Sequence, residues 1–190
     1  MNHQDPQFTR RIIRGFETHI INTRPDIATE DVVARLDGAL GLIEEYVPHH
    51  FRRFHRDFSG FLVERRAYRG AFLVASRTCM VELTFVVNRS FSLAQVAATI
   101  LHEAMHARLH ARRVAIAPDD AARQERFCRQ AEIEFGMLVP GGDAVVKRAV
   151  ESLALADREI APVIDDALAA RRIAEADRAA GAGRPPGTAS

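Results

Sequence analysis

The chain has 190 residues, 47 % of them hydrophobic, and a formal net charge of +1. This composition is typical of a folded chain with one sizeable core, so we expect one compact domain plus tails. The near balance of acidic and basic residues excludes a strong electrostatic attraction to nucleic acid or to an anionic membrane. Two cysteines are too few for a disulfide scaffold. Residues 1–6 lack the basic-then-apolar pattern of a secretory signal, and no apolar run reaches the length of about 18 residues that spans a membrane. We therefore expect a cytoplasmic protein.

The first 58 residues are predicted to be helical. Apolar side chains spaced three or four positions apart between residues 6 and 22 predict an amphipathic helix. A second, longer helix is predicted from Val32 to Val47, and Pro48 terminates it. Residues 49–56 are expected to form a short basic turn or helix. The histidines of this segment are interpreted as solvated rather than metal-binding, because adjacent residues on a helix point about 100° apart: His49, His50 and His55.

Strand-forming segments follow residue 59. Residues 61–63 and 71–74 are short strand candidates, and residues 81–87, rich in β-branched and aromatic side chains, are the best strand in the chain. We therefore expect an α+β fold that is mainly helical. Its sheet is predicted to be small, with about three antiparallel strands and with helices packed on one face.

A long helix follows the predicted sheet. Ser92 is a helix N-cap, and Gln95 stands three residues later as its capping-box partner. From Leu93 to beyond His110 the sequence contains no glycine or proline that would interrupt the helix. An apolar stripe at helical spacing indicates that one side of this helix is buried.

This helix carries the pentapeptide His-Glu-Ala-Met-His. Residues four apart lie on one face of a helix, one turn from each other, so His102 and His106 can bind one zinc ion together. Glu103 lies on the adjacent face, where its carboxylate can reach a water molecule held by the metal. This arrangement is typical of a zinc-dependent hydrolase.

A catalytic zinc ion needs a third protein ligand. His110 lies about 12 Å along the helix axis from His102, which is too far for a shared ion. The next helix is expected to begin near Pro118 and to return antiparallel, which brings Glu125 level with both histidines. The other acids of that helix fall short of the ion or overshoot it: Asp119, Asp120, Glu132 and Glu134.

An H-E-x-x-H motif followed about twenty residues later by a glutamate on the next helix resembles the gluzincin branch of the zinc metallopeptidases. The pattern TILHEAMHARLH…QERFCRQAEIEFGMLVPGG is also similar to a group of small, uncharacterised bacterial proteins regarded as metallopeptidases. The resemblance covers residues 61–142 and is strongest at the pentapeptide. Thermolysin-like enzymes follow their glutamate with a Ser-Asp pair whose aspartate supports a histidine, whereas this chain continues from Glu125 with Arg126-Phe127-Cys128-Arg129.

The resemblance implies a zinc-dependent metallopeptidase with a zincin-like core. Carried over by position, it makes His102, His106 and Glu125 the ligands of Zn²⁺ and Glu103 the general base that hydrolyses a peptide bond through a metal-activated water. It also implies that an extended peptide or protein substrate pairs with the strand beside the active helix, for which residues 81–87 are the candidate. The oxyanion donor stays open among four residues: Tyr46, Tyr68, Arg108 and His110.

The alternative function is a non-catalytic, zinc-stapled interaction or regulatory protein. It requires a closed site in which Cys128 or His110 provides a fourth ligand. We interpret Cys128 as a buried apolar residue, with a thiol near zinc as the other possibility, and Cys79 as structural. Glu103 favours the enzyme, because a structural site has no use for a carboxylate at that position.

Three further helices are predicted after the H-E-x-x-H helix: Pro118 to the Pro140-Gly141-Gly142 stop, Asp143 to about Asp157, and a last one from Pro162. The resulting organisation is N-terminal helices in residues 1–58, a zincin-like metal-binding core of the same compact domain in 59–142, C-terminal helices in 143–178, and a disordered tail in 179–190.

Overall fold

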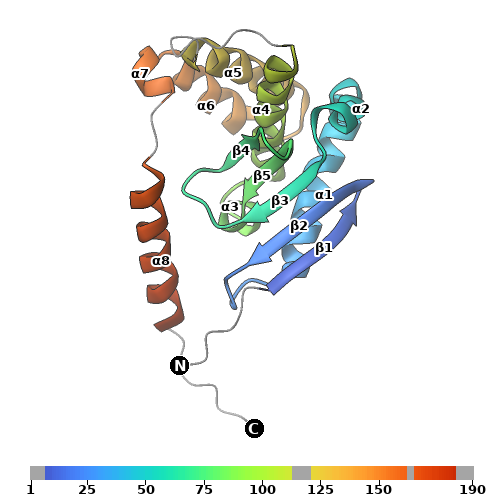
Figure 1. Cartoon of the computed structure of the whole chain (residues 1–190). Coiled ribbons are helices and arrows are strands. Elements are labelled where there is room, and N and C mark those ends of the chain that lie inside the picture. Colours follow the sequence, from blue (N-terminus) through green and yellow to red (C-terminus); the bar gives the residue numbers. More distant parts are fainter. Residues whose placement is uncertain (1–6, 113–120, 162–164, 183–190) are drawn as a thin grey trace.

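The computed structural model describes residues 7–112, 121–161 and 165–182, which form an α+β fold with a five-stranded mixed sheet (Figure 1). In chain order its elements are β1 (Gln7–Ile13), β2 (Phe16–Asn22), α1 (Thr29–Tyr46), α2 (Pro48–Asp57), β3 (Gly60–Glu64), β4 (Gly70–Leu73), β5 (Thr78–Glu82), α3 (Leu83–Val87), α4 (Leu93–Ala111), α5 (Ala121–Leu138), α6 (Asp143–Leu153), α7 (Asp157–Ile160) and α8 (Asp166–Ala182).

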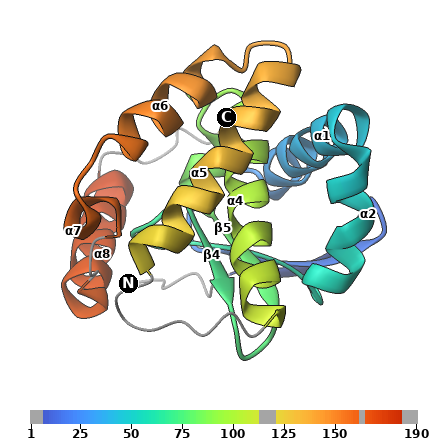
Figure 2. The same ribbon diagram turned by 90° about the horizontal axis from the view of Figure 1, so that it is seen from above.

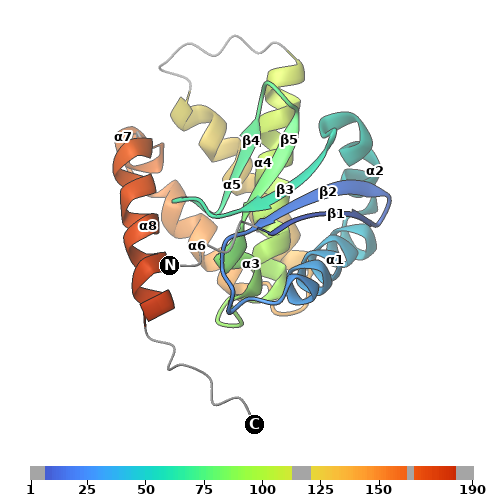
Figure 3. The same ribbon diagram turned by 60° about the horizontal axis from the view of Figure 1, so that its bottom comes forward.

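The sheet has the strand order β1-β2-β3-β5-β4, with β1 and β4 at its two edges (Figure 3). The two outer pairs are antiparallel, whereas β2 pairs with β3 and β3 with β5 in parallel. The prediction of a three-stranded antiparallel sheet was therefore wrong in size and in direction. The parallel pairs arise because each of these strands is joined to its neighbour by a crossover rather than by a tight turn.

The predicted helix at residues 6–22 is instead the hairpin β1–β2. Arg14 and Gly15 both have positive φ, 47° and 84°, as the two central residues of a tight hairpin turn require. Along β2 every second residue is buried, beginning with Phe16. Phe8, Ile12, Phe16 and Ile20 are four positions apart, a spacing that fits a period of two as well as the helical period, which explains the error.

The predicted strand at residues 81–87 was wrong beyond its first two residues, because residues 83–87 form α3. Strand β5 ends at Glu82, whose carboxylate accepts a hydrogen bond of 2.7 Å from the backbone N–H of Phe85 and so caps α3. β5 lies inside the sheet, between β3 and β4. The edge strand beside α4 is therefore β4 and not residues 81–87.

Helices α1 and α4 pack side by side on one face of the sheet (Figure 2). The predicted capping box of α4 is confirmed: Gln95 N–H donates to Ser92 Oγ at 3.2 Å, and Ser92 N–H donates to the Gln95 side chain at 2.9 Å. The buried side of α4 carries Ile100 and Leu101, both at most 1 % exposed. Burial of this apolar stripe fixes the rotation of α4 about its axis and hence the direction of its polar side chains.

The remaining helices agree with the sequence in outline. The predicted second helix is α1, and Pro48 begins α2 directly after it. The helix expected from Asp143 to about Asp157 is α6, which already ends at Leu153, and the short helix α7 begins at Asp157. Helix α8 continues to Ala182, so the start of the expected tail at residue 179 is wrong. Three other predictions lie outside the described residues: the start of a helix at Pro118, the start of a helix at Pro162, and the tail in residues 183–190. No helix in the described part of the chain is long and apolar enough to cross a membrane.

The basic segment after Pro48 is a helix that packs against α4, and the expectation that its histidines are solvated holds for exposed His49 and His55 but is wrong for half-buried His50. Arg108 of α4 donates to Asp57 at 2.9 Å and to Nδ1 of half-buried His50 at 2.6 Å. His55 stacks on Phe16 with a ring separation of 4.2 Å. Burial, and then the charge of Arg108, lower the pKa of His50 to about 4.

These contacts predict that His50 contributes to acid destabilisation. Below its unfolded pKa of 6.5, the unfolded chain takes up a proton that folded His50 takes up only near pH 4, so the free energy of unfolding falls as pH is lowered across this window. The variant His50→Gln keeps an acceptor for Arg108 without titrating, and should lose less stability between pH 6.5 and pH 4 in urea unfolding. The exposed neighbour provides the control His49→Gln, and an unchanged pH slope in His50→Gln contradicts the assignment.

Candidate metal centre

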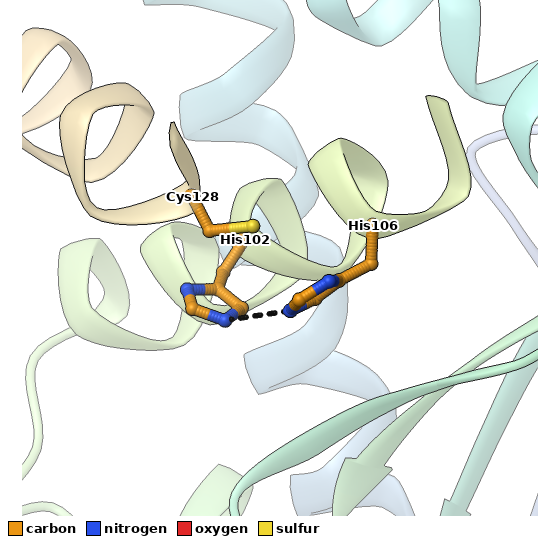
Figure 4. A group of neighbouring side chains, drawn as sticks. All are labelled: His102, His106 and Cys128. Atoms are coloured by element: carbon orange, nitrogen blue, oxygen red, sulfur yellow. Dashed lines mark hydrogen bonds between the residues drawn. The ribbon is translucent and has the colours of Figure 1, made fainter. Parts of the chain in front are cut away.

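The two histidines of the pentapeptide converge on one point beside α4. Their Nε2 atoms are 3.1 Å apart, and their rings are tilted by 62° with centroids 4.9 Å apart (Figure 4). His102 is buried, and the side chain of His106 is 23 % exposed. The one-turn spacing therefore produces the predicted convergence of two imidazole nitrogen atoms.

Glu125 of α5 completes this group. Helix α5 packs against α4, and the Glu125 carboxylate oxygens lie 3.3 Å from His102 Nε2 and 3.1 Å from His106 Nε2. Two ligands of a tetrahedral zinc ion at about 2.0–2.1 Å from the metal are separated by about 3.3 Å. The donor types and their separations therefore fit a zinc ion held by these three side chains.

The electrostatics of the group favours positive charge between its members. Burial opposes protonation of His102, but hydrogen bonds to Glu125 and Glu132 outweigh it and raise the pKa of His102 to about 9. Burial likewise opposes ionisation of Glu125, yet the two histidines hold the pKa of this carboxyl far below its usual value. The group can hold either protons or a metal cation between nitrogen and oxygen donors.

Glu103 is buried between α4 and the edge strand β4. Its side chain accepts a hydrogen bond from the backbone of Phe72 in β4, and burial raises the pKa of its carboxyl group. A Cβ atom at Gly70 would approach Glu103 Oε1 to 2.9 Å and Thr99 Cγ2 to 2.6 Å. Only glycine allows β4 to lie this close to α4, and the close approach fixes the carboxylate of Glu103 beside the two histidines.

Glu132, two turns after Glu125 on α5, supports His102 from behind. It is fully buried, and its Oε1 lies 2.9 Å from His102 Nδ1. Arg129 donates to it at 2.8 Å and Arg148 of α6 at 3.2 Å. Burial opposes ionisation of Glu132, but the bond to His102 and the charges of Arg148 and Arg129 lower its pKa. Because an ionised carboxylate only accepts, Nδ1 of His102 donates and Nε2 keeps its lone pair for a metal.

Sequence reasoning considered Glu132 only as a metal ligand and excluded it, because it lies too far along α5. Glu132 instead binds Nδ1 of His102, which is on the far side of the ring from the Nε2 atom that faces Glu125. A position further along α5 than Glu125 is needed to reach it. A usable signal was present: positions seven apart share a helix face, and Arg129 stands between Glu125 and Glu132 on that face. Glu132, one turn beyond Cys128, thus supplies the carboxylate that supports His102.

Cys128 lies on the same face of α5 and is fully buried (Figure 4). Its Sγ atom and ligand nitrogen atoms of His102 and His106 all lie within 4.8 Å of one another. Burial raises the pKa of the thiol well above its usual value. Cys128 is thus both a buried side chain and a close neighbour of the two histidines.

A cleft of about 720 Å³ opens over the group, between β4 and α5. Tyr68 and His110, two of the four candidate oxyanion donors, line this cleft. Tyr46 is not among its lining residues, and Arg108 is bound to Asp57 and His50 between α4 and α2. The described residues therefore leave Tyr68 and His110 as candidates.

Removal of the Glu132 charge should destabilise the protein. The change Glu132→Gln leaves two partly buried guanidinium groups without their carboxylate, which should lower the free energy of unfolding by about 2–3 kcal/mol. Glu134→Gln, an exposed position on the same helix, should change it by less than about 0.5 kcal/mol. Urea denaturation of both variants provides the measurement, and equal stabilities would show that Glu132 is not a structural anchor.

Comparisons with known proteins identify no relative of this chain. No protein-family model matches the chain, and neither does a curated protein or a solved structure. The chemistry of the site is therefore argued from the positions of its own residues.

Proposed function

We propose that the chain is a zinc-dependent metallopeptidase. The observation that carries the proposal is the convergence of His102 Nε2, His106 Nε2 and the Glu125 carboxylate at separations of 3.1–3.3 Å under an open cleft. Three protein ligands with space beside them are typical of a catalytic zinc site. Glu103 beside the ligands supplies the carboxylate that a hydrolase needs and that a structural site does not.

The residues of the site divide the chemistry among them. A bound zinc ion would supply a water molecule of lowered pKa and an electrophile for the peptide carbonyl. Glu103 accepts the proton of the attacking water and then delivers it to the leaving amine. Glu132 keeps His102 in one tautomer and one orientation throughout, and Tyr68 or His110 donates to the developing oxyanion.

Strand β4 supports the choice of an extended peptide as the substrate. The carbonyl of Arg69 accepts from Glu82 N–H of β5 at 2.9 Å, so the ladder alternation directs the backbone groups of Gly70 and Phe72 to the free edge. Phe72 donates from this edge to Glu103. A peptide added along β4 therefore has its backbone beside the general base.

A second candidate function is a zinc staple without catalysis. It is favoured by Cys128, whose sulfur lies within 4.8 Å of the histidine ligand atoms and would close the site as a fourth ligand. The buried carboxylate of Glu103 and the cleft above the group favour the enzyme, because neither has a use in a closed site.

The proposal predicts that metal analysis distinguishes the role of Glu103, a proton acceptor, from that of Glu125, a metal ligand. Glu103→Gln should keep about one zinc ion per chain and lose at least about 100-fold in peptide hydrolysis, because it removes only the proton acceptor. Glu125→Gln should lose zinc and activity together. Zinc content and cleavage of a mixed peptide library are measured on the full chain, with Glu134→Gln as the matched control. Loss of zinc from Glu103→Gln, or no cleavage by the zinc-loaded wild type, contradicts the proposal.

A substitution at Cys128 distinguishes the enzyme from the staple. In the enzyme, Cys128→Ser should bind zinc within about threefold of the wild-type affinity, since the thiol is not a ligand. In the staple, loss of a fourth ligand should weaken binding by more than about 100-fold. Competition with a chelating dye measures the affinity.

A further inference from the structure

The two ends of the cleft differ in charge. Three elements run along the cleft: β4 and α4 in one direction and α5 in the opposite direction. Gly70 therefore lies beside Glu103, and further along the cleft Phe72 lies beside His110. The end beyond His110 is lined by Val74, Ala121 and Gln124. The end beyond Gly70 is lined by three arginines from three different segments: Arg69, Arg129 and Arg148.

These arginines outnumber the carboxylate groups that pair with them. Glu132 binds both Arg129 and Arg148, and Glu125, the other acid near Arg129, faces the two histidines. Arg69 has no ion pair with any described residue; its guanidinium instead lies over the rings of Phe85 and Phe91, at 5.1 Å and 4.4 Å from their centroids. Of the three guanidinium groups at this end of the cleft, two share Glu132, Arg129 also lies 3.7 Å from Glu125, and Arg69 has no carboxylate partner among the described residues.

Two further observations describe the guanidinium groups at this end of the cleft. Within the described residues, Nε of Arg129 is buried and has no hydrogen-bond partner. Burial lowers the pKa of Arg69, and the nearby charges of Arg148 and Arg129 lower it further, whereas the charge of Glu132 acts in the opposite direction. The cluster is therefore crowded with like charge, which a carboxylate placed among the guanidinium groups would offset.

We propose that this end of the cleft recognises a carboxylate of the peptide substrate, from an acidic side chain or from the C-terminus. The inference rests on the proposed peptidase function and names its substrate class. Arg69 directly precedes Gly70, which lies opposite Glu103, so the carboxylate lies one or two residues from the cleaved bond at about 3.4 Å per residue. A peptide that pairs antiparallel with β4 has its C-terminal side toward Arg69, which places the acid after the cleaved bond.

Peptide libraries test the preference. In each library one position of the peptide carries either Glu or Gln, so that only the charge at that position differs. Each library is made in two forms, with a free and with an amidated C-terminus. The zinc-loaded wild type should cleave peptides with a carboxylate one or two residues after the bond about tenfold better, mainly through KM. A preference for Glu identifies an acidic side chain, and a preference for the free terminus identifies a terminal carboxylate. Equal cleavage of all peptides overturns the inference and leaves the peptidase intact.

The variant Arg69→Met tests the residue itself. Methionine keeps an apolar chain against the two phenylalanine rings but removes the charge, so the tenfold preference should disappear while cleavage of the neutral peptides persists. Arg89→Met removes one exposed arginine outside the cleft and should keep the preference.

A binding experiment tests the inference without catalysis. Succinic and glutaric monohydroxamates carry a metal-binding group at one end and a carboxylate at the other, and their amide counterparts differ only in charge. Calorimetry on the zinc-loaded chain should give about tenfold tighter binding of at least one acid than of its amide, and no difference in Arg69→Met. Equal affinities overturn the inference even where no peptide is cleaved. Failure of every hydroxamate to bind argues instead against the metal site and thus against the proposed function.

Discussion

The antiparallel contact between α4 and α5 is the constraint on which the site depends. It brings the Glu125 carboxylate within 3.3 Å of two imidazole nitrogen atoms, and it places Glu132 behind His102. The two glutamates lie on one face of α5 and act on opposite nitrogens of one ring. A rotation of α5 about its axis would remove both contacts at once, so the burial of its apolar side is what holds the donor set together.

The charges around the site are arranged in layers. The carboxylates nearest the histidines would balance a divalent cation, and the arginines that hold Glu132 stand at one end of the cleft. The same residues therefore serve two purposes: they anchor the carboxylate that orients His102, and they make that end of the cleft cationic. The edge strand β4 connects these features, because it fixes Glu103 at Gly70 and begins directly after Arg69.

The parts that were predicted correctly from the sequence depend on local geometry. The capping box of α4, its two histidines and the distance back to Glu125 follow from the rise and period of a helix. The hairpin β1–β2 was missed, because its apolar spacing fits two periods and its turn begins with an arginine at positive φ, Arg14. The parallel strand pairs and the support of His102 by Glu132 were missed because both depend on how distant segments meet, which no single segment encodes.

X-ray absorption at the zinc edge of the loaded full chain tests the central claim most directly. Two histidines, one carboxylate and water predict a first coordination shell of nitrogen and oxygen only, at about 2.0–2.1 Å, with imidazole scattering behind it. A sulfur atom at about 2.3 Å would assign Cys128 to the metal and close the site. That result, or a spectrum without imidazole, would contradict the catalytic zinc site proposed for this chain.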